Sequence, residues 1–192
     1  MKNYQAIEDF LINRLRLNLP QGLIYHDWNH TFEVLQAAEL IAANEKINDA
    51  QLFLLKVAVL CHDEGMIRTY KNHEAASCEF ARAELPHFDL AADEIEIICG
   101  MIMATKIPQS PKNDLERIIA DADLEYLGTD DFENHSQKLF EEAKIYLGVK
   151  NQHDWDEIQV KFLEGHHYHT GFCKKNQEPQ KQMHLQQVKA RL

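Results

Sequence analysis

The stretch LFLLKVAVLCHDEG (residues 52–65) decides the fold class, because it joins a long apolar segment to three ionisable side chains. Its apolar residues recur at the three-to-four-residue spacing of a helix: Leu52, Leu55, Val59 and Leu60. Histidine and aspartate are costly to bury without a partner, and a metal ion satisfies neutral imidazole and carboxylate together. An exposed last turn capped by Gly65 is the simpler alternative. His62 and Asp63 are therefore candidate metal ligands.

The rest of the chain repeats this helical spacing between sparse glycines and prolines. The pattern predicts helices over residues 7–15, 34–41, 77–85, 93–104, 115–127, 132–147 and 155–166. The window IEIICGMIM (95–103) is the closest to a strand, but a lone strand would have nothing to pair with. The basic tail after Gly171 is interpreted as a solvated terminal helix, with a short docked helix as the alternative. We therefore expect one all-α domain over residues 1–192.

Composition limits the partners. The formal net charge is -11, and nucleic acid binds mainly to lysine and arginine, so we expect no duplex nucleic acid as a partner. Four scattered cysteines without a Cys-x-x-Cys pair indicate reduced thiols and a cytoplasmic location. No apolar stretch has the length of a membrane span, so no membrane partner is expected. A small phosphorylated molecule remains compatible, since a bound metal dominates the local charge.

Two further segments carry groups that could join His62 and Asp63. In YHDWNHT (25–31), His26 and His30 share one helical face if the helix begins by Asp27. In IIADADLEYLG (118–128), two carboxylates interrupt an apolar helical run. Asp123 lies on the more apolar face of that run, whereas Asp121 has Arg117 as a neighbour with which it could pair. The sequence leaves open which aspartate binds metal.

The order His30, then His62-Asp63, then Asp121 or Asp123 resembles the HD superfamily of metal-dependent phosphohydrolases over residues 25–128. The resemblance implies a helical bundle of the HD/phosphodiesterase type, with residues 130–192 packed on this motif core. It also implies one divalent metal, and the mixed nitrogen and oxygen ligands suit Mn, Fe, Mg, Co or Zn. The segment around His26 is similar to a cyclic-nucleotide phosphodiesterase signature, although Asp27 and Asn29 depart from it.

These features predict the following roles. His26 donates a proton to the leaving oxygen and Asp63 orients the attacking water, with Glu64 a weaker candidate for the base. His73 and Lys106 are candidate contacts for the substrate phosphate, although each also has a structural reading: His73 as a surface residue after a cap at Asn72, and Lys106 as the end of a helix. The histidine-rich segment 162–169 is interpreted as a helix end and not as a second metal site.

We expect an enzyme that hydrolyses a phosphate monoester or diester of a small molecule, with a nucleotide favoured as substrate. A homodimer is compatible with the sequence. Two other functions stay open: a metal-binding or nucleotide-binding regulatory module without turnover, and a di-iron oxygenase of the same superfamily. The oxygenase needs extra histidines for a second metal, and only His73 and His87 stand in the middle of the chain. One metal is therefore expected.

Overall fold

The computed structural model describes residues 2–192, which form helices and loops and contain no strand. The α-helices are α1 (Tyr4–Asn18), α2 (Trp28–Asn44), α3 (Asp49–Cys61), α4 (His73–Glu84), α5 (Ala92–Thr105), α6 (Asp114–Asp123), α7 (Phe132–Tyr146), α8 (Gln152–Gly165), α9 (Gly171–Asn176) and α10 (Glu178–Lys189). Short 3-10 helices follow three of them: η1 (Glu64–Ile67), η2 (Leu85–Phe88) and η3 (Glu125–Gly128). The all-α fold expected from the sequence is confirmed.

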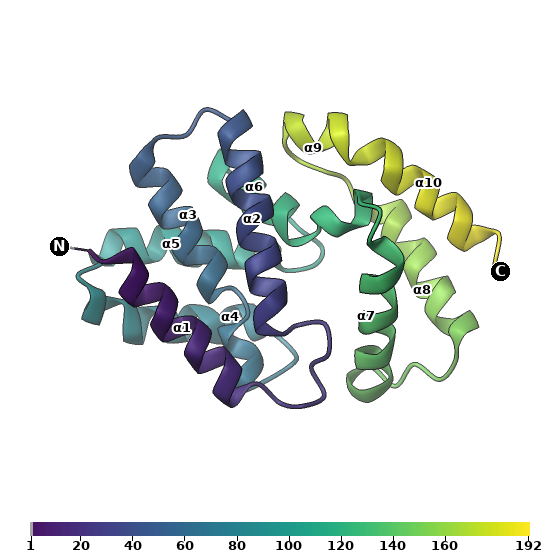
Figure 1. Cartoon of the computed structure of the whole chain (residues 1–192), viewed down its shortest axis with the longest axis horizontal. Helices are drawn as coiled ribbons and strands as arrows, with labels where there is room; N and C mark the ends of the chain where they lie inside the picture. The colour runs from purple at the N-terminus through teal and green to yellow at the C-terminus, as the bar shows by residue number, and fades with distance from the viewer. Residues whose placement is uncertain (1) are drawn as a thin grey trace.

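The helices fall into two groups that Figure 1 shows side by side. Helices α1 to α6 fill one half of the molecule and α7 to α10 the other, and the two ends of the chain lie at opposite sides. A single hydrophobic core nevertheless joins both groups, because buried residues from α1 to α10 belong to one contiguous cluster. Within the first group, α3 packs against α1, α2 and α5, so its apolar residues are enclosed on several sides.

The window 95–103 is helical, as predicted, and forms most of α5. Its buried side chains are Ile95, Ile98, Cys99, Met101 and Ile102, which face α3, α4 and α6. No helix among residues 2–192 is both long enough and apolar enough to cross a membrane.

Two helix predictions are wrong, both near the junction of the two groups. The predicted helix 115–127 ends at Asp123, because Leu124 leaves helical geometry and the Tyr168 hydroxyl donates to the Leu124 carbonyl (3.2 Å). The tail is not a solvated helix, since α10 packs on α8 and buries Leu185 and Val188. The short helix α9 was not predicted.

The turn after α3 is pressed against α4, and Gly65 permits this approach. A Cβ atom on Gly65 would lie 2.0 Å from the carbonyl oxygen of His73 and 2.8 Å from the backbone nitrogen of Ser77. The Ser77 side chain fastens the contact: its Oγ accepts from the Gly65 N–H (2.8 Å) and donates to the His62 carbonyl (2.7 Å). The glycine of the HDEG stretch is therefore required for packing and does not simply cap α3.

Gly65→Ala is expected to lower the free energy of unfolding by about 3 kcal/mol, because backbone atoms of α4 cannot move aside for the added methyl group. Gly165→Ala is the matched control, since no atom lies within 4 Å of the position a Cβ would take there. We expect that control to change stability by less than about 1 kcal/mol. Urea unfolding of both variants measures the difference, and equal stabilities would contradict the packing argument.

Candidate metal centre

His62 is fixed at the end of α3 with one ring nitrogen facing a polar cluster. Its Nδ1 lies 2.7 Å from the Val59 carbonyl oxygen, so Nδ1 carries the proton and donates. The lone pair is thereby left on Nε2, which is buried and has no hydrogen-bond partner. A backbone carbonyl that fixes the other nitrogen of a histidine is the usual arrangement behind a metal ligand.

Asp63 follows His62 and is also buried. Its Oδ2 lies 3.3 Å from His62 Nε2 and 3.7 Å from His30 Nε2, but has no hydrogen-bond partner. Its Oδ1 points the other way and lies 3.4 Å from His73 Nε2. Burial opposes ionisation, yet the surrounding imidazoles of His62, His26 and His73 hold the pKa of Asp63 well below its usual range.

His30 enters the cluster from the first turn of α2. The Asp27 side chain accepts from the His30 N–H (2.9 Å) and so caps the helix, which begins at Trp28. The prediction that His26 shares a helical face with His30 is therefore wrong, because His26 lies in the loop before the cap. Their rings still come together, with centroids 5.7 Å apart.

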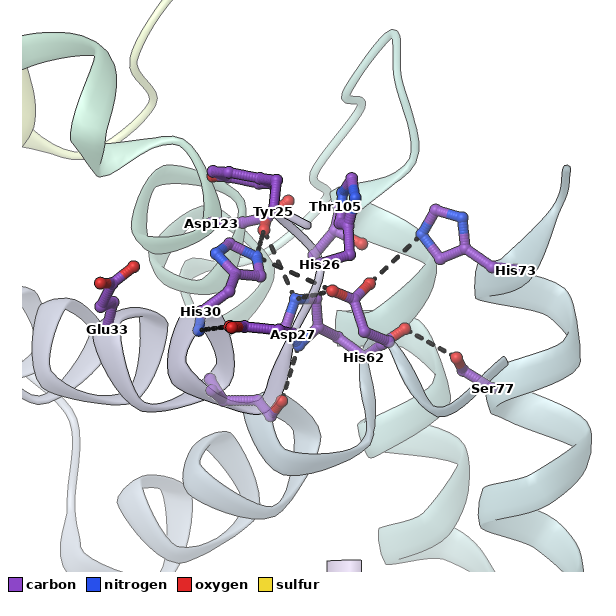
Figure 2. A network of polar contacts seen from close by, with 12 residues as sticks. Tyr25, His26, Asp27, His30, Glu33, His62, His73, Ser77, Thr105 and Asp123 are labelled. Atoms are coloured by element: carbon purple, nitrogen blue, oxygen red, sulfur yellow. Dashed lines mark hydrogen bonds and ion pairs between the residues drawn. The ribbon is translucent and has the colours of Figure 1, made fainter. Parts of the chain in front are cut away.

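Asp123 completes the group from the last residue of α6. Its Oδ1 lies 3.2 Å from His30 Nε2 and 3.5 Å from His62 Nε2. One ligand atom from each of His30, His62 and Asp123 lies within 4.8 Å of the others. Figure 2 shows these side chains gathered in one place. Two imidazoles and a carboxylate that converge in this way, with a free nitrogen on His62 and a free oxygen on Asp63, fit a divalent metal.

Asp121 lies outside this group, although the sequence allowed it as a ligand. It is fully buried and both of its oxygens are occupied, because they accept from the N–H groups of His169 and Thr170 (2.8 Å each) and from the Thr170 hydroxyl (2.7 Å). Arg117, its alternative partner in the sequence, pairs with Asp114 instead at 2.7 Å. Asp121 fastens the start of α9 and leaves Asp123 to face the histidines.

His26 borders the group and is held by a residue that the sequence did not single out. Its Nδ1 lies 2.5 Å from Oε1 of Glu142, a fully buried carboxylate on α7. The other oxygen of Glu142 accepts from the N–H groups of Tyr25 and His26, at 3.1 and 3.2 Å. Burial lowers the pKa of His26, but the bond to Glu142 and the charges of Asp63 and Asp123 outweigh it, and the net shift is upward.

No spacing rule could have found Glu142, because it lies more than a hundred residues along the chain from His26. The only signal is a glutamate on the side of α7 that also carries buried residues. Ser77, which fastens the turn after His62, was also missed, because its contacts with His62 and Gly65 form only when α4 packs against that turn.

The two predicted substrate contacts are separated by the structure. His73 begins α4, and its Nε2 lies 3.4 Å from Asp63 Oδ1, so it is part of the cluster and not a surface residue. Figure 2 shows His73 beside the other labelled histidines. The Asn72 side chain makes no cap and instead accepts from Lys106 (2.9 Å), which turns away toward a groove on the other side of α5. Thr105, one residue earlier, does face the cluster.

Glu64 is not positioned as a base. It is buried below the turn and accepts from Arg14 Nε on α1 at 3.0 Å, away from the histidines. Burial raises its pKa to about 7, although the Arg14 guanidinium pulls the value down. Glu64 therefore ties η1 to α1.

The histidine-rich segment is a helix end, as predicted. Helix α8 ends at Gly165, and His166 is buried beside Lys181, whose Nζ donates to the His166 carbonyl. Burial and the Lys181 charge lower the pKa of His166 to about 3. His87, needed for a second metal, is exposed on η2.

A cavity of about 290 Å³ opens beside the cluster, between the two groups of helices. Asp63, Asp123, His26 and His73 line one end, and side chains from α7 and α8 line the other. Of the candidate metal ligands, Asp63 and Asp123 are thus accessible to a small molecule from this side.

Three comparisons with known proteins bear on the chain. The family model described as HD domain matches residues 27–127. The fold is similar to the crystal structure of a predicted HD superfamily hydrolase from an uncultured Thermotogales bacterium, with a TM-score of 0.62 and 20% sequence identity over 95% of this chain and 89% of that one. No curated protein matches the sequence.

Metal content should depend on Asp123 and not on Asp121. We expect Asp123→Ala and His62→Ala to remove most of the bound metal, because each takes away one ligand atom of the cluster. Asp121→Asn is the matched control: it should keep the metal but lose about 1–3 kcal/mol of stability through its weakened hydrogen bonds. Elemental analysis and thermal unfolding of the Mn-loaded proteins measure both effects. Metal lost from a folded Asp121→Asn protein would contradict this assignment.

Proposed function

The chain belongs to the HD domain family, and from that membership and its cluster of ligands we propose that it is a metal-dependent hydrolase of a phosphate ester on a small molecule. The observation that carries the proposal is the convergence of ligand atoms from His30, His62 and Asp123 within 4.8 Å of one another, with Asp63 beside them at the end of an open cavity. Neither Nε2 of His62 nor Oδ2 of Asp63 makes a hydrogen bond, and a bound ion would pair with both.

His30, His62, Asp63 and Asp123 would hold the metal. A divalent ion bound there supplies Lewis-acid chemistry, lowering the pKa of water and withdrawing charge from a phosphate. The choice among Mn, Fe, Mg, Co and Zn stays open, since all accept this donor set.

Other side chains near the metal ligands can orient water and bind the phosphate. Asp63 has an oxygen on each side, so Oδ1, which faces His73, can accept a hydrogen bond from a water and orient it toward phosphorus. His73 lies on the same side, and an N–H of its ring can donate to a phosphate oxygen. Thr105 reaches the cavity, but its hydroxyl already donates to the Ile102 carbonyl at 2.8 Å, so it can only accept.

His26 is suited to donate the proton that the leaving oxygen needs. A general acid must be protonated at the working pH and must face the substrate. The Glu142 carboxylate favours the protonated ring, and His26 lines the cavity. Glu142 acts through His26 and is therefore a positioning residue. The two backbone N–H groups that it also accepts keep the loop before α2 in place.

A nucleotide is the substrate class that the sequence favours, and the cytoplasm is the expected location. A regulatory module without turnover would have the same ligands, so the measurement that separates it from an enzyme is phosphate release. A di-iron oxygenase would be indicated by two irons per chain and oxygen consumption.

Metal-loaded protein should release phosphate from a panel of small phosphate esters, and His62→Ala should abolish the release because it removes a ligand. A malachite-green assay with Mn, Mg, Co and Fe detects the product. Binding of metal and ester by the folded protein with no release from any ester would overturn the proposal in favour of the regulatory module.

Glu142→Gln should lower kcat about tenfold to a hundredfold, which is within the contribution of a general acid. The glutamine removes the negative charge that raises the pKa of His26, so that pKa falls and the ring loses its proton at lower pH. The alkaline limb of the kcat profile should therefore move to lower pH. Glu141→Gln is the control, because Glu141 is a half-exposed residue of α7 that pairs with Lys144 and not with His26. An unmoved limb in Glu142→Gln would remove Glu142 from this role.

A further inference from the structure

The cavity beside the metal centre is walled mainly by apolar side chains. Six aromatic rings surround it: Tyr25, Tyr70, Tyr126, Phe132, Trp155 and Phe162. Aliphatic side chains of α7, α8 and the segments joined to them fill the gaps, among them Leu127, Leu139, Leu147, Ile158 and Leu163. Polar groups gather at the end formed by the candidate ligands, so the cavity has one charged end and one apolar end.

The polar side chains at the apolar end are already paired with one another. Ser136 Oγ donates to Gln159 Oε1 (2.5 Å) and accepts from Trp155 Nε1 (3.1 Å). Gln159 Nε2 donates to Asp156 Oδ1 at 3.2 Å. Sugar hydroxyls or the polar edge of a base would have to break these bonds, and unpaired buried polar groups cost free energy.

No lysine or arginine lines this cavity within residues 2–192. Its charged groups, apart from the histidines, are the carboxylates of Asp63, Glu74 and Asp123. A chain of two or three phosphates needs cationic side chains along its length. The cavity therefore provides for a single phosphate, held at the end where the metal ligands lie.

The volume of the cavity limits the size of the apolar group that a substrate can carry. An engineered protein cavity of about 150 Å³ encloses one benzene molecule, so a cavity of about 290 Å³ has room for a phosphate and an aromatic or alkyl group of roughly six to eight carbons. Burial of such a group displaces water from both surfaces and favours binding in proportion to its apolar area.

We propose that the substrate is a phosphomonoester of an apolar alcohol, with an alkyl or aromatic group lodged between α7 and α8 and its phosphate at the metal centre. This inference rests on the proposed function and narrows it, and it departs from the nucleotide that the sequence favours. Water enters at phosphorus, the phosphorus–oxygen ester bond breaks, and the alcohol leaves with one proton while inorganic phosphate retains the rest.

The test compares kcat/KM of the Mn-loaded full chain for n-alkyl phosphates from ethyl to decyl, with glycerol phosphate and adenosine monophosphate beside them. We expect kcat/KM to rise about threefold to fourfold for each added methylene until the cavity is filled, and then to level off. Glycerol phosphate and adenosine monophosphate should be slower than hexyl phosphate. Hydrolysis that is independent of chain length, or fastest for adenosine monophosphate, would overturn the inference while the proposed function stands.

A binding measurement distinguishes failure of the apolar site from failure of the proposed hydrolase function. Alkyl phosphonates carry the same charged group but have no ester bond to hydrolyse, and calorimetry gives their affinity for the same metal-loaded chain. Affinity that rises with chain length, with no ester hydrolysed, would support the apolar site and overturn the hydrolase. Affinity that does not rise with chain length would overturn the apolar site.

A matched pair of variants places the effect in the cavity. Ile158 lies on the cavity wall in α8 yet is 41% exposed, so Ile158→Asp should fold and should lower kcat/KM for octyl phosphate about tenfold. The value for ethyl phosphate should stay within about twofold, because its chain does not reach α8. Ile145→Asp on α7, 59% exposed and outside the cavity, should change neither value. Equal losses for both esters in Ile158→Asp would contradict the placement.

Discussion

The structure depends on two carboxylates, the buried Asp63 and the half-buried Asp123, which lie where α3, α6 and the start of α2 meet. Charges of one sign in a poorly solvated site require a positive partner. Within residues 2–192 the side chains nearest to these carboxylates are the rings of His30, His62 and His73, and the Nδ1 proton of His62 is directed toward the Val59 carbonyl. A divalent cation resolves this conflict, and the surrounding contacts hold the four side chains ready for one: the Asp27 cap, the Ser77 clamp and the close approach at Gly65.

The two groups of helices contribute different things to the site. All four candidate ligands lie within the part of the chain that the family model covers, on α2, at the end of α3 and on α6. Glu142 and about half of the apolar wall come from α7, α8 and the residue after α7, beyond that part. In the proposed function the metal ligands thus come from the part of the chain that the family model matches, whereas the proton donor's partner and part of the cavity wall come from the C-terminal helices. Proteins that share the first set can differ in substrate through the second.

The sequence predicted the elements whose cause is local. Apolar spacing predicted α3 and α5, and ionisable residues inside apolar runs singled out His62, Asp63 and the pair Asp121 and Asp123 as candidates, because periodicity and the cost of burial are visible in a short window. It could not separate Asp121 from Asp123, since the choice depends on the backbone of residues 169–170, which reaches α6 only in the folded chain. The sequence also did not single out Glu142, because that residue meets Tyr25 and His26 only in the folded chain. The end of α6 at Asp123 also depends on a distant group, the Tyr168 hydroxyl.

These distant contacts share one physical effect: each ties the C-terminal helices to an element that carries a ligand. Asp121, two residues before Asp123 on α6, accepts a hydrogen bond from the start of α9. Glu142 accepts one from His26, which lies in the loop four residues before His30. The rings of Tyr70 and Tyr146 stack with their centroids 4.5 Å apart and close a third side of the cavity. The cavity is therefore braced on several sides by buried hydrogen bonds and a ring contact. A braced cavity holds its shape without a ligand, so the apolar wall keeps a fixed position relative to the metal centre, as selection by size requires.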